Sequence, residues 1–405
     1  MDAARLCLVV ALGFAAAPAL AGWIYLAFAH GWFWRTGPGL RAETGPPEWP
    51  EVVAVVPARD EAALLPRTLP SLLGQEYPGR FRVVVVDDGS ADGTAAVAER
   101  LGRDAETELC VVRAGERPEG WAGKVWAMAA GVRAAGEPAF LLFTDADIAY
   151  APGTLTRLVR AAAGEGYDLV SQMATLRTRT AWERAIVPAF VYFFALLYPF
   201  RRVGRPGSRT AAAAGGCMLV RASTLAAAGG PAAIRGALID DVALGRLVKR
   251  HGGRCRLDLS RDVVSLRPYP RLADLWTMVA RSAYTQLRYS APLLAGTVLG
   301  LALLFVAPPV AAAAGAIGLA LGGSAAAGPV AAVGFGAWAI MAGTYVPILR
   351  FYRLSVLRAA GLPMVAVLYT AMTLDSARRY YTGRGGVWKG RTLAGRSGPA
   401  GAQRG

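Results

Sequence analysis

The sequence predicts an α/β fold, in which a mainly parallel sheet carries helices on both faces, combined with transmembrane helices. Short β-branched runs alternate with helical stretches between residue 51 and about residue 270, which is the rhythm of βαβ units. Acidic residues directly follow several of these runs, where parallel strands present their carboxyl ends. Two apolar stretches, at residues 6 to 28 and 291 to 349, contain no charged residue.

Composition narrows the possible partners. The chain has 405 residues, of which 54% are hydrophobic, and a net charge of +16. The positive charges are scattered arginines without a Lys/Arg block, and Arg350, Arg353 and Arg358 follow an apolar run. This pattern favours a membrane surface, and no nucleic-acid partner is predicted. The cysteines form no C-x-x-C pair and the two histidines are far apart, so any catalytic metal must bind carboxylates.

The N-terminal part of the chain is predicted to be a membrane anchor. Residues 1–30 form one transmembrane helix, because their apolar run exceeds the roughly 20 residues that a spanning helix needs. A cleaved signal peptide is the alternative, since Ala19-Leu20-Ala21 resembles a cleavage site. A Pro- and Gly-rich linker at 31–50 then leads into a soluble domain at 51–290.

The C-terminal part is predicted to return to the membrane. Residues 291–349 are long enough for two transmembrane helices, with a break near Gly322-Gly323-Ser324. The region 350–405 is basic, and the positive-inside rule places it and the soluble domain in the cytoplasm, with the chain multi-pass in the inner (plasma) membrane. Its short apolar segment 359–374 is more typical of an interfacial or re-entrant helix, and its tail is expected to be disordered.

The first two motifs each join a strand to a polar loop. Pro57-Ala58-Arg59-Asp60-Glu61 follows the run Val52–Val56, and Asp87-Asp88-Gly89-Ser90 follows the run Val83–Val86. Helices are expected to begin near Ala62 and Ala91. A carboxylate at such a strand end can accept hydrogen bonds from a base N–H or a ribose hydroxyl. The competing interpretation of the second motif is a helix cap by Ser90 or Asp92.

A third pair of acids suggests a metal site. Asp145 and Asp147 follow the apolar run Leu141–Phe143 at spacing i, i+2, which places both on the same side of an extended chain. Such oxygen ligands suit Mg²⁺ or Mn²⁺, which bind through one or two carboxylates and substrate phosphate.

Two more charged motifs complete the set. Lys124 follows Gly123, a flexible position, and could reach a diphosphate. Asp240-Asp241 opens an apparent helix, where the alternative role of the pair is to favour the helix dipole.

Taken in order, these motifs resemble those of the family 2 glycosyltransferases, which have the GT-A fold. The resemblance covers roughly residues 50 to 290, and the ordered set is far more specific than any single member. It implies a nucleotide-sugar donor, bound by Pro57, Arg59, Glu61, Asp87, Asp88, Lys124 and Asp145. It also implies a divalent metal, Mg²⁺ or Mn²⁺, on Asp147 and Asp145, and catalysis by Asp241 as general base beside Asp240. The family more often has Glu-Asp at this last pair.

A finer resemblance concerns the membrane members of the family. Many carry a Q/R-x-x-R-W segment, and here Arg281–Tyr289 occupies the expected place without the tryptophan. The resemblance implies that this segment closes over donor and acceptor through Arg281, Tyr284, Gln286, Arg288 and Tyr289. The layout of anchor, domain and C-terminal spans is similar to that of hopanoid-biosynthesis-associated glycosyltransferases, and also of ceramide glucosyltransferases.

The predicted function is inverting transfer of a sugar from a nucleotide-sugar donor to a lipid acceptor, by the finer resemblance in hopanoid biosynthesis. Aromatic, Arg-flanked segments near 183–200 and 272–290 predict interfacial helices that hold the active site against the bilayer, although 186–200 could instead be a core helix of the soluble domain. Two alternatives stay open. A processive polysaccharide synthase would need more spans than the two or three predicted, and a non-catalytic GT-A-like membrane scaffold would bind nucleotide without turnover.

Overall fold

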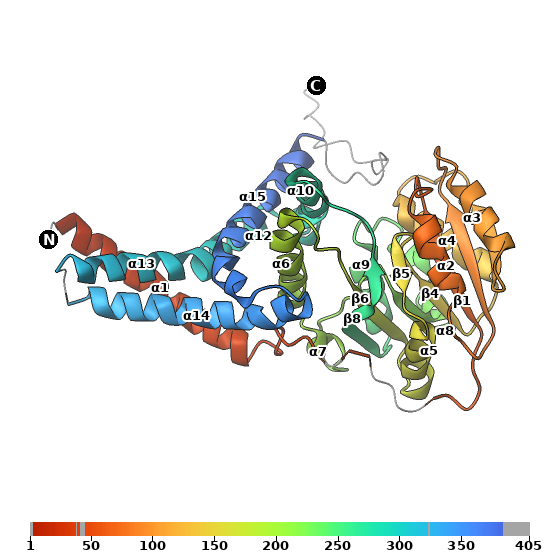
Figure 1. The fold of residues 1–405 in the computed structure, drawn as a ribbon, viewed down its shortest axis with the longest axis horizontal. Helices are drawn as coiled ribbons and strands as arrows, with labels where there is room; N and C mark the ends of the chain where they lie inside the picture. The colour runs from red at the N-terminus through yellow and green to blue at the C-terminus, as the bar shows by residue number, and fades with distance from the viewer. Residues whose placement is uncertain (1–2, 38, 41–44, 323–324, 384–405) are drawn as a thin grey trace, which may run out of the picture. The chain divides into compact units, whose positions relative to one another are not determined.

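The computed structural model describes residues 3–37, 39–40, 45–322 and 325–383 (Figure 1). These residues fall into two compact units. The sheet unit comprises the described residues of 37–177 and 200–269, with residues 382–383, and the helical unit comprises those of 3–36, 178–199 and 270–381. The predicted tail beyond residue 383 and the predicted break at Gly323-Ser324 lie outside the described residues, as does part of the predicted linker.

The sheet unit is built on an eight-stranded sheet with the order β3-β2-β1-β4-β7-β6-β8-β5. Its strands are β1 Val52–Ala58, β2 Phe81–Asp87, β3 Glu108–Arg113, β4 Phe140–Phe143, β5 Ile148–Tyr150, β6 Leu169–Thr175, β7 Met218–Arg221 and β8 Cys255–Ser265. Strands β1 to β4 are mutually parallel, and β8 is parallel to β6, whereas β7 and β5 run antiparallel to their neighbours. The α/β prediction is confirmed, with a sheet that is mixed at one side.

Strand β1 lies between β2 and β4, and every residue of β1 is buried. Burial on both faces of the sheet explains why its sequence is a continuous apolar run without polar alternation. Pro57 is tolerated in this central strand because the pairing of β1 with β4 ends at Val55 and Phe143, before the missing N–H of Pro57 would matter there. The parallel pairing brings the loops after β1, β2 and β4 to one edge of the sheet.

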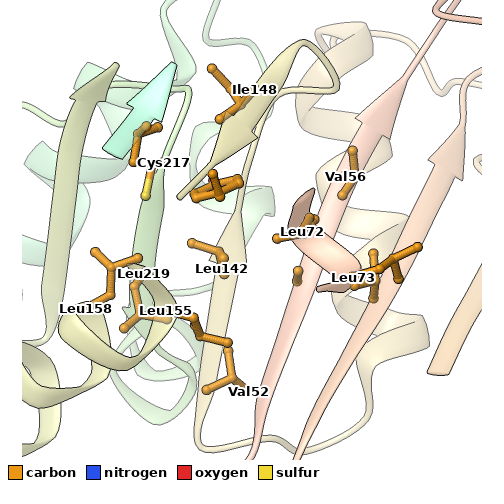
Figure 2. Packing of buried hydrophobic residues seen from close by; sticks show 14 of the residues in the cluster. Val52, Val56, Leu72, Leu73, Leu142, Ile148, Leu155, Leu158, Cys217 and Leu219 are labelled. Carbon is orange, nitrogen blue, oxygen red and sulfur yellow. The ribbon is translucent and has the colours of Figure 1, made fainter. Parts of the chain in front are cut away.

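Helices cover the sheet. They are α2 Leu65–Leu73, α3 Thr94–Arg103, α4 Gly123–Ala135, α5 Thr154–Val159, α7 Phe200–Val203, α8 Ala222–Ala227 and α9 Asp240–Arg250, with a π turn at Arg160–Gly164 and a 3-10 turn at Pro231–Ile234. Figure 2 shows part of the core, where Leu72 of α2, Leu155 of α5 and Val52 of β1 are buried in one cluster. Burying each such side chain stabilises the fold by about 1.5–3 kcal/mol.

The helical unit contains α1 Ala3–Phe28, α6 Ala181–Leu197, α10 Leu272–Ala280, α11 Ala283–Gln286, α12 Ala291–Leu301, α13 Ala307–Ala320, α14 Ala327–Phe351 and α15 Leu362–Tyr381. A π turn at Ala302–Val306 joins α12 to α13, and a 3-10 turn at Val356–Gly361 precedes α15. By length and composition, five described segments could cross a membrane: Ala11–Phe28, Ala181–Val203, Ala291–Ala320, Ala327–Phe351 and Val356–Tyr381.

Two of these five segments correspond to helices that the sequence placed at the membrane surface. The predicted short segment 359–374 belongs to α15, which is 20 residues long, and the predicted interfacial segment near 183–200 belongs to α6. Both helices belong to the helical unit, so the predicted domain 51–290 differs from the observed division at residues 178–199 and 270–290. Whether α6 and α15 span the membrane or lie on it stays a prediction.

Helix α6 packs inside the helical unit along much of its length. Tyr192 is fully buried, and its hydroxyl lies 2.7 Å from the hydroxyl of Thr344 in α14. The ring of Phe193 lies 4.8 Å from that of Tyr369 in α15. A capping box fixes the start of the helix, because Thr180 accepts from the backbone N–H of Glu183 and Glu183 accepts from that of Thr180.

Helices α13 and α14 lie side by side (Figure 1), and their backbones approach closely at Gly334. A Cβ atom added at Gly334 would lie 2.5 Å from the backbone nitrogen of Ala312 and 2.8 Å from the carbonyl oxygen of Pro308. Small residues serve this purpose in membrane helices, where packing replaces the hydrophobic effect as the force that joins helices.

We therefore expect Gly334→Ala to lower the stability of the protein by about 1–3 kcal/mol, because the backbone of α13 must shift. Gly343→Ala is the matched control on the same helix, since a Cβ there meets nothing within 4 Å. Both changes raise helix propensity equally, so the difference between their thermal unfolding midpoints in detergent measures the contact alone. Equal midpoints would contradict close packing at Gly334.

Candidate active site

The loops after β1 and β2 are joined by hydrogen bonds between them. Asp60 has a positive φ of 51°, and its carboxylate accepts from the N–H of Ala91 at 2.9 Å while its own N–H donates to the Ser90 hydroxyl at 3.0 Å. The N–H of Glu61 donates to the Thr94 hydroxyl at 2.8 Å. These bonds hold a strained backbone in place, which is a common property of binding loops.

Asp87 and Asp88 are both buried at this edge. Arg59 donates to the carbonyl oxygen of Asp88 at 2.5 Å, and its guanidinium lies 3.8 Å from the Asp88 carboxylate. Asp87 accepts from the N–H of Ser90 at 3.1 Å, which forms a turn. Helix α3 begins three residues later than expected, with Gly93 at its N-cap position. The Asp92 carboxylate accepts from the N–H of Thr94, the first residue of the helix, at 3.0 Å, so the alternative of a cap is borne out for Asp92. The Ser90 hydroxyl instead accepts from the N–H of Asp60. Nucleoside binding by these acids stays a prediction.

Asp145 and Asp147 lie in the turn between β4 and β5, where the N–H of Ile148 donates to the carbonyl of Asp145 at 3.2 Å. The expected extended chain between the two acids is therefore wrong, and they have different partners. Asp147 accepts from the Ser265 hydroxyl at 2.6 Å and lies 3.4 Å from the Arg267 guanidinium. Burial raises the pKa of Asp147, an effect that Arg267 opposes and Asp145 increases.

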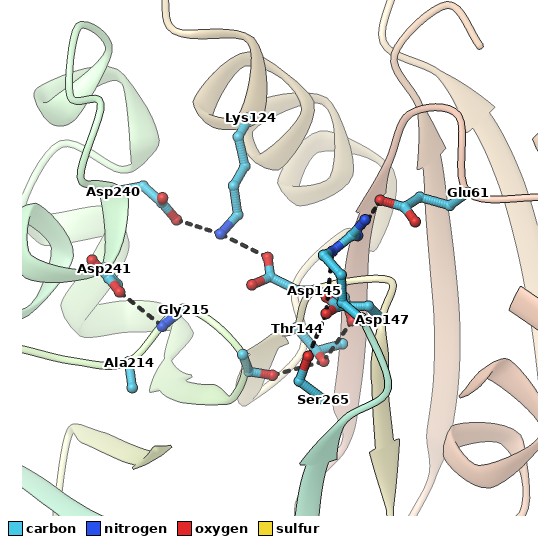
Figure 3. A network of polar contacts seen from close by, with 12 residues as sticks. Glu61, Lys124, Thr144, Asp145, Asp147, Ala214, Gly215, Asp240, Asp241 and Ser265 are labelled. Atoms are coloured by element: carbon cyan, nitrogen blue, oxygen red, sulfur yellow. Dashed lines mark hydrogen bonds and ion pairs between the residues drawn. The ribbon is translucent and has the colours of Figure 1, made fainter. Parts of the chain in front are cut away.

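Lys124 joins two of the predicted acids (Figure 3). Its ammonium lies 2.7 Å from the Asp145 carboxylate and 2.9 Å from the Asp240 carboxylate. Gly123 begins α4, so Lys124 belongs to the first helical turn and does not follow a flexible glycine as expected. Burial by itself would lower the pKa of Lys124, but the two carboxylates raise it above the usual lysine range, so the ammonium is charged.

Asp240 and Asp241 open α9, as predicted. Asp241 accepts from the backbone N–H of Gly215 at 3.0 Å (Figure 3) and from that of Val242 at 2.7 Å. Burial and the charge of Asp240 raise the pKa of Asp241 to about 6, although Lys124 and the two N–H groups oppose the shift. The two neighbouring acids thus have different partners: Asp240 is paired with a lysine, whereas Asp241 is held by two backbone N–H groups and has a raised pKa, which suits a general base.

Close packing positions α9 for this role. A Cβ at Gly245 would lie 2.6 Å from the backbone carbon of Ala212, so only glycine lets the helix approach this segment. The segment continues directly to Gly215, whose N–H holds Asp241.

Three residues of the candidate site were not predicted from the sequence. Ser265 and Arg267 reach Asp147 because β5 pairs with the end of β8, where Ile148 lies opposite Ser265. Arg267 also lies 2.5 Å from the Glu61 carboxylate, so it joins the first and fourth motifs. Gly215 contributes only a backbone N–H, and such a contact cannot be predicted from the type of side chain. A cation directly after a strand, as at Arg267, was the one available signal.

The carboxylates at this site fit a divalent metal ion whose remaining ligands come from a substrate. Within the described ranges, no group of three or more His, Cys, Asp or Glu residues could hold a metal by itself. Asp145 and Asp147 are nonetheless carboxylates whose present partners are the cations Lys124 and Arg267. Mg²⁺ and Mn²⁺ commonly use one or two carboxylates and complete their coordination with substrate phosphate, so the residues are compatible with such an ion.

The predicted closing segment Arg281–Tyr289 lies in the helical unit. Arg288 and Tyr289 both have positive φ, at 54° and 58°. Helix α15 supports this turn, since the ring of Tyr289 stacks on Tyr380 at 4.4 Å and the Tyr284 and Tyr381 hydroxyls are 2.8 Å apart. Gln286 donates to the Tyr198 hydroxyl. The proposed role of this segment in closing over donor and acceptor stays a prediction.

Comparison with known proteins identifies similar sequences over parts of the chain. A Pseudomonas syringae undecaprenyl-phosphate 4-deoxy-4-formamido-L-arabinose transferase is 30% identical over 135 residues, which are 33% of this chain and 38% of that protein. A Mesorhizobium japonicum N-acetylglucosaminyltransferase is 34% identical over 116 residues, 27% of this chain and 25% of that protein. The chain therefore matches well under half the length of either relative.

Two further comparisons concern the fold and the family. The mannosyltransferase PcManGT from Pyrobaculum calidifontis, solved with GDP-Man and Mn²⁺, has a TM-score of 0.56 to this structure at 21% identity, covering 91% of this chain and 98% of that one. This likeness supports the GT-A fold. Residues 50–280, more than half of the chain, match the model of the glycosyltransferase-like family 2. The chain therefore belongs to this family.

Proposed function

We propose that the protein transfers a sugar from a nucleotide-sugar donor to a lipid acceptor, with inversion at the anomeric carbon. The observation that carries this proposal is the convergence of Asp145, Asp147, Lys124, Asp240 and Asp241 at one edge of the sheet. These groups provide sites for a diphosphate and a base of raised pKa within one small region.

The donor would lie along this edge. The loops that contain Arg59, Glu61, Asp87 and Asp88 would bind the nucleoside, with Pro57 at the end of β1 beneath them. Lys124 would contact the diphosphate. A divalent metal held by Asp147 and Asp145 would neutralise the charge of the departing diphosphate, which makes it a better leaving group.

Asp241 would act as the general base. Its carboxylate takes the proton of an acceptor hydroxyl while that oxygen forms a bond to the anomeric carbon. The bond between the anomeric carbon and the phosphate oxygen breaks, and the nucleoside diphosphate leaves with the electron pair. The N–H groups of Gly215 and Val242 fix the carboxylate for this step. Attack opposite to the leaving group inverts the configuration.

A lipid acceptor is supported by the helical unit and by one relative. Among the residues that the structure describes, five helical segments are long and apolar enough to cross a membrane. The relative from Pseudomonas syringae is named for undecaprenyl phosphate, a lipid. A hopanoid-type acceptor is the narrower form of the proposal, and it rests on the sequence resemblance alone. The positive-inside rule places the sheet unit in the cytoplasm at the inner membrane.

A processive polysaccharide synthase is the second candidate. The number of spans predicted from the sequence is too small for a pore. One of the five candidate segments, Ala181–Val203, also joins β6 to β7, which pair in one sheet and so lie on the same side of a membrane. The product distinguishes the two activities, since a synthase yields a chain of sugars and the proposed enzyme yields a lipid with one sugar. A non-catalytic scaffold would bind nucleotide and give no product.

The function itself is tested with purified protein in detergent. We expect one nucleotide sugar from a panel, supplied with Mn²⁺ or Mg²⁺ and a bacterial lipid extract, to give a lipid carrying one sugar by mass spectrometry. Transfer only to water-soluble saccharides, or growth of a polymer, would refute the lipid-acceptor proposal.

Asp241→Asn should reduce transfer by about 10²–10⁴-fold, because the amide cannot accept a proton, while donor binding persists. In the wild type, kcat/KM should fall about tenfold per pH unit below about pH 6, since the base is active only when deprotonated. The measurement is a pH profile with lipid acceptor. Asp104→Asn, at an exposed acid after α3, is the control and should behave as the wild type. A profile that stays flat down to pH 4 would exclude Asp241 as the base.

Metal removal should stop the reaction. We expect EDTA to abolish transfer and Mn²⁺ to restore it, and Asp147→Asn to weaken metal-dependent donor binding by more than the roughly 10–100-fold typical for loss of an outer-shell partner. Calorimetric titration of the donor with and without Mn²⁺ measures this directly, again with Asp104→Asn as control. Full activity in metal-free buffer would rule out the metal site.

A further inference from the structure

The ammonium of Lys124 occupies the position between two acids that come from distant parts of the sheet unit. Asp145 belongs to the turn after β4, and Asp240 begins α9. The Lys124 side chain is only 17% exposed and that of Asp240 only 12%, so water screens this contact weakly, whereas the Asp145 side chain is 36% exposed. One positive charge thus compensates two carboxylates across the centre of the site (Figure 3).

This arrangement conflicts with metal binding in the absence of substrate. The Lys124 ammonium lies 2.7 Å from one carboxylate oxygen of Asp145, a residue that would hold the divalent ion in the proposed function. A metal ion that bound at Asp145 without a diphosphate would have to compete with Lys124 for that oxygen, or would lie beside the positive charge of the lysine. A diphosphate removes the conflict, because its oxygens offer Lys124 a new partner and add the negative charge that the metal needs.

The geometry points to Lys124 as a placeholder cation that makes metal binding depend on the donor diphosphate. The inference rests on the proposed function, in which the same acids bind donor and metal. Without donor, Lys124 holds Asp145 and Asp240 together and keeps the metal out. When the donor binds, Lys124 moves its ion pairs from the two carboxylates to the diphosphate, and the metal takes its place on Asp145. Metal and donor therefore bind together.

The test measures Mn²⁺ binding by electron paramagnetic resonance in EDTA-treated full-length protein without any phosphate compound. Lys124→Met removes the competing charge, so we expect it to bind Mn²⁺ about tenfold or more tightly than the wild type. Lys124→Arg keeps a cation between the acids and should bind Mn²⁺ as weakly as the wild type. Arg103→Met, which removes one exposed positive charge near the end of α3, controls for net charge and should change nothing.

A second measurement separates this role from a merely structural one. UDP and GDP are titrated calorimetrically into each variant at fixed Mn²⁺, and Lys124→Met should bind the nucleotide that the wild type accepts more weakly. Opposite effects on metal alone and on nucleotide are the signature of the exchange, whereas a damaged site would weaken both. Lys124→Gln replaces Lys124→Met if thermal unfolding shows that the methionine variant is not folded.

The outcomes distinguish the inference from the proposed function. If the neutral variants bind Mn²⁺ no more tightly than the wild type, or if the wild type binds Mn²⁺ tightly without nucleotide, the placeholder role is overturned even when the enzyme transfers sugar. A different pair of results would separate them the other way. In that case neither nucleotide binds any variant, Lys124→Met binds Mn²⁺ more tightly than the wild type, and a further Asp145→Asn change removes this gain. The placeholder role of Lys124 then stands, and the proposed class of donor fails.

Discussion

Charge compensation at the carboxyl edge of the sheet is the constraint on which the rest of this site depends. Parallel pairing of β1, β2 and β4 brings several acids to one place, and five of them, Glu61, Asp87, Asp88, Asp147 and Asp240, are buried. Buried carboxylates are costly unless they are paired. Three cations, Arg59, Arg267 and Lys124, provide this pairing, and each joins segments far apart in the sequence. In the proposed function, the same concentration of carboxylates would also suit the site to a divalent metal ion.

The sequence predicted the elements whose signal is local. Apolar runs identified β1, β2 and β4, and acids placed directly after them identified most of the site, because the carboxyl ends of parallel strands share an edge. The starts of α2 and α3 were each predicted three residues early, since the loops before them are held by cross-loop bonds such as that from the N–H of Ala62 to Asp92. Ser265 and Arg267 could not be assigned, because the antiparallel pairing of β5 with β8 is a long-range contact with no local pattern.

The helical unit illustrates a different limit of sequence analysis. An uninterrupted apolar stretch gives the length of a helix but not its neighbours, and α6 carries both buried and exposed aromatic or aliphatic side chains. Tyr192 and Thr344 form a buried polar contact that hydropathy alone does not reveal. The close approach of the α13 and α14 backbones at Gly334 cannot be predicted from composition either, because the chain is rich in glycine throughout. The packing of these helices therefore follows from particular small and hydroxyl side chains, which replace hydrophobic burial as the source of specificity in lipid.

In the proposed mechanism, the raised pKa of Asp241 would also govern what happens after each transfer. The acceptor's proton would remain on this carboxyl when the product leaves, and the next cycle would need the ionised form. An acid with a pKa of about 6 releases that proton to water spontaneously at neutral pH. A much stronger base would keep it and would require a dedicated relay to solvent. For a general base, the environment of Asp241 would therefore be a compromise between basicity and recycling, because simple dissociation of the proton would restore the ionised form.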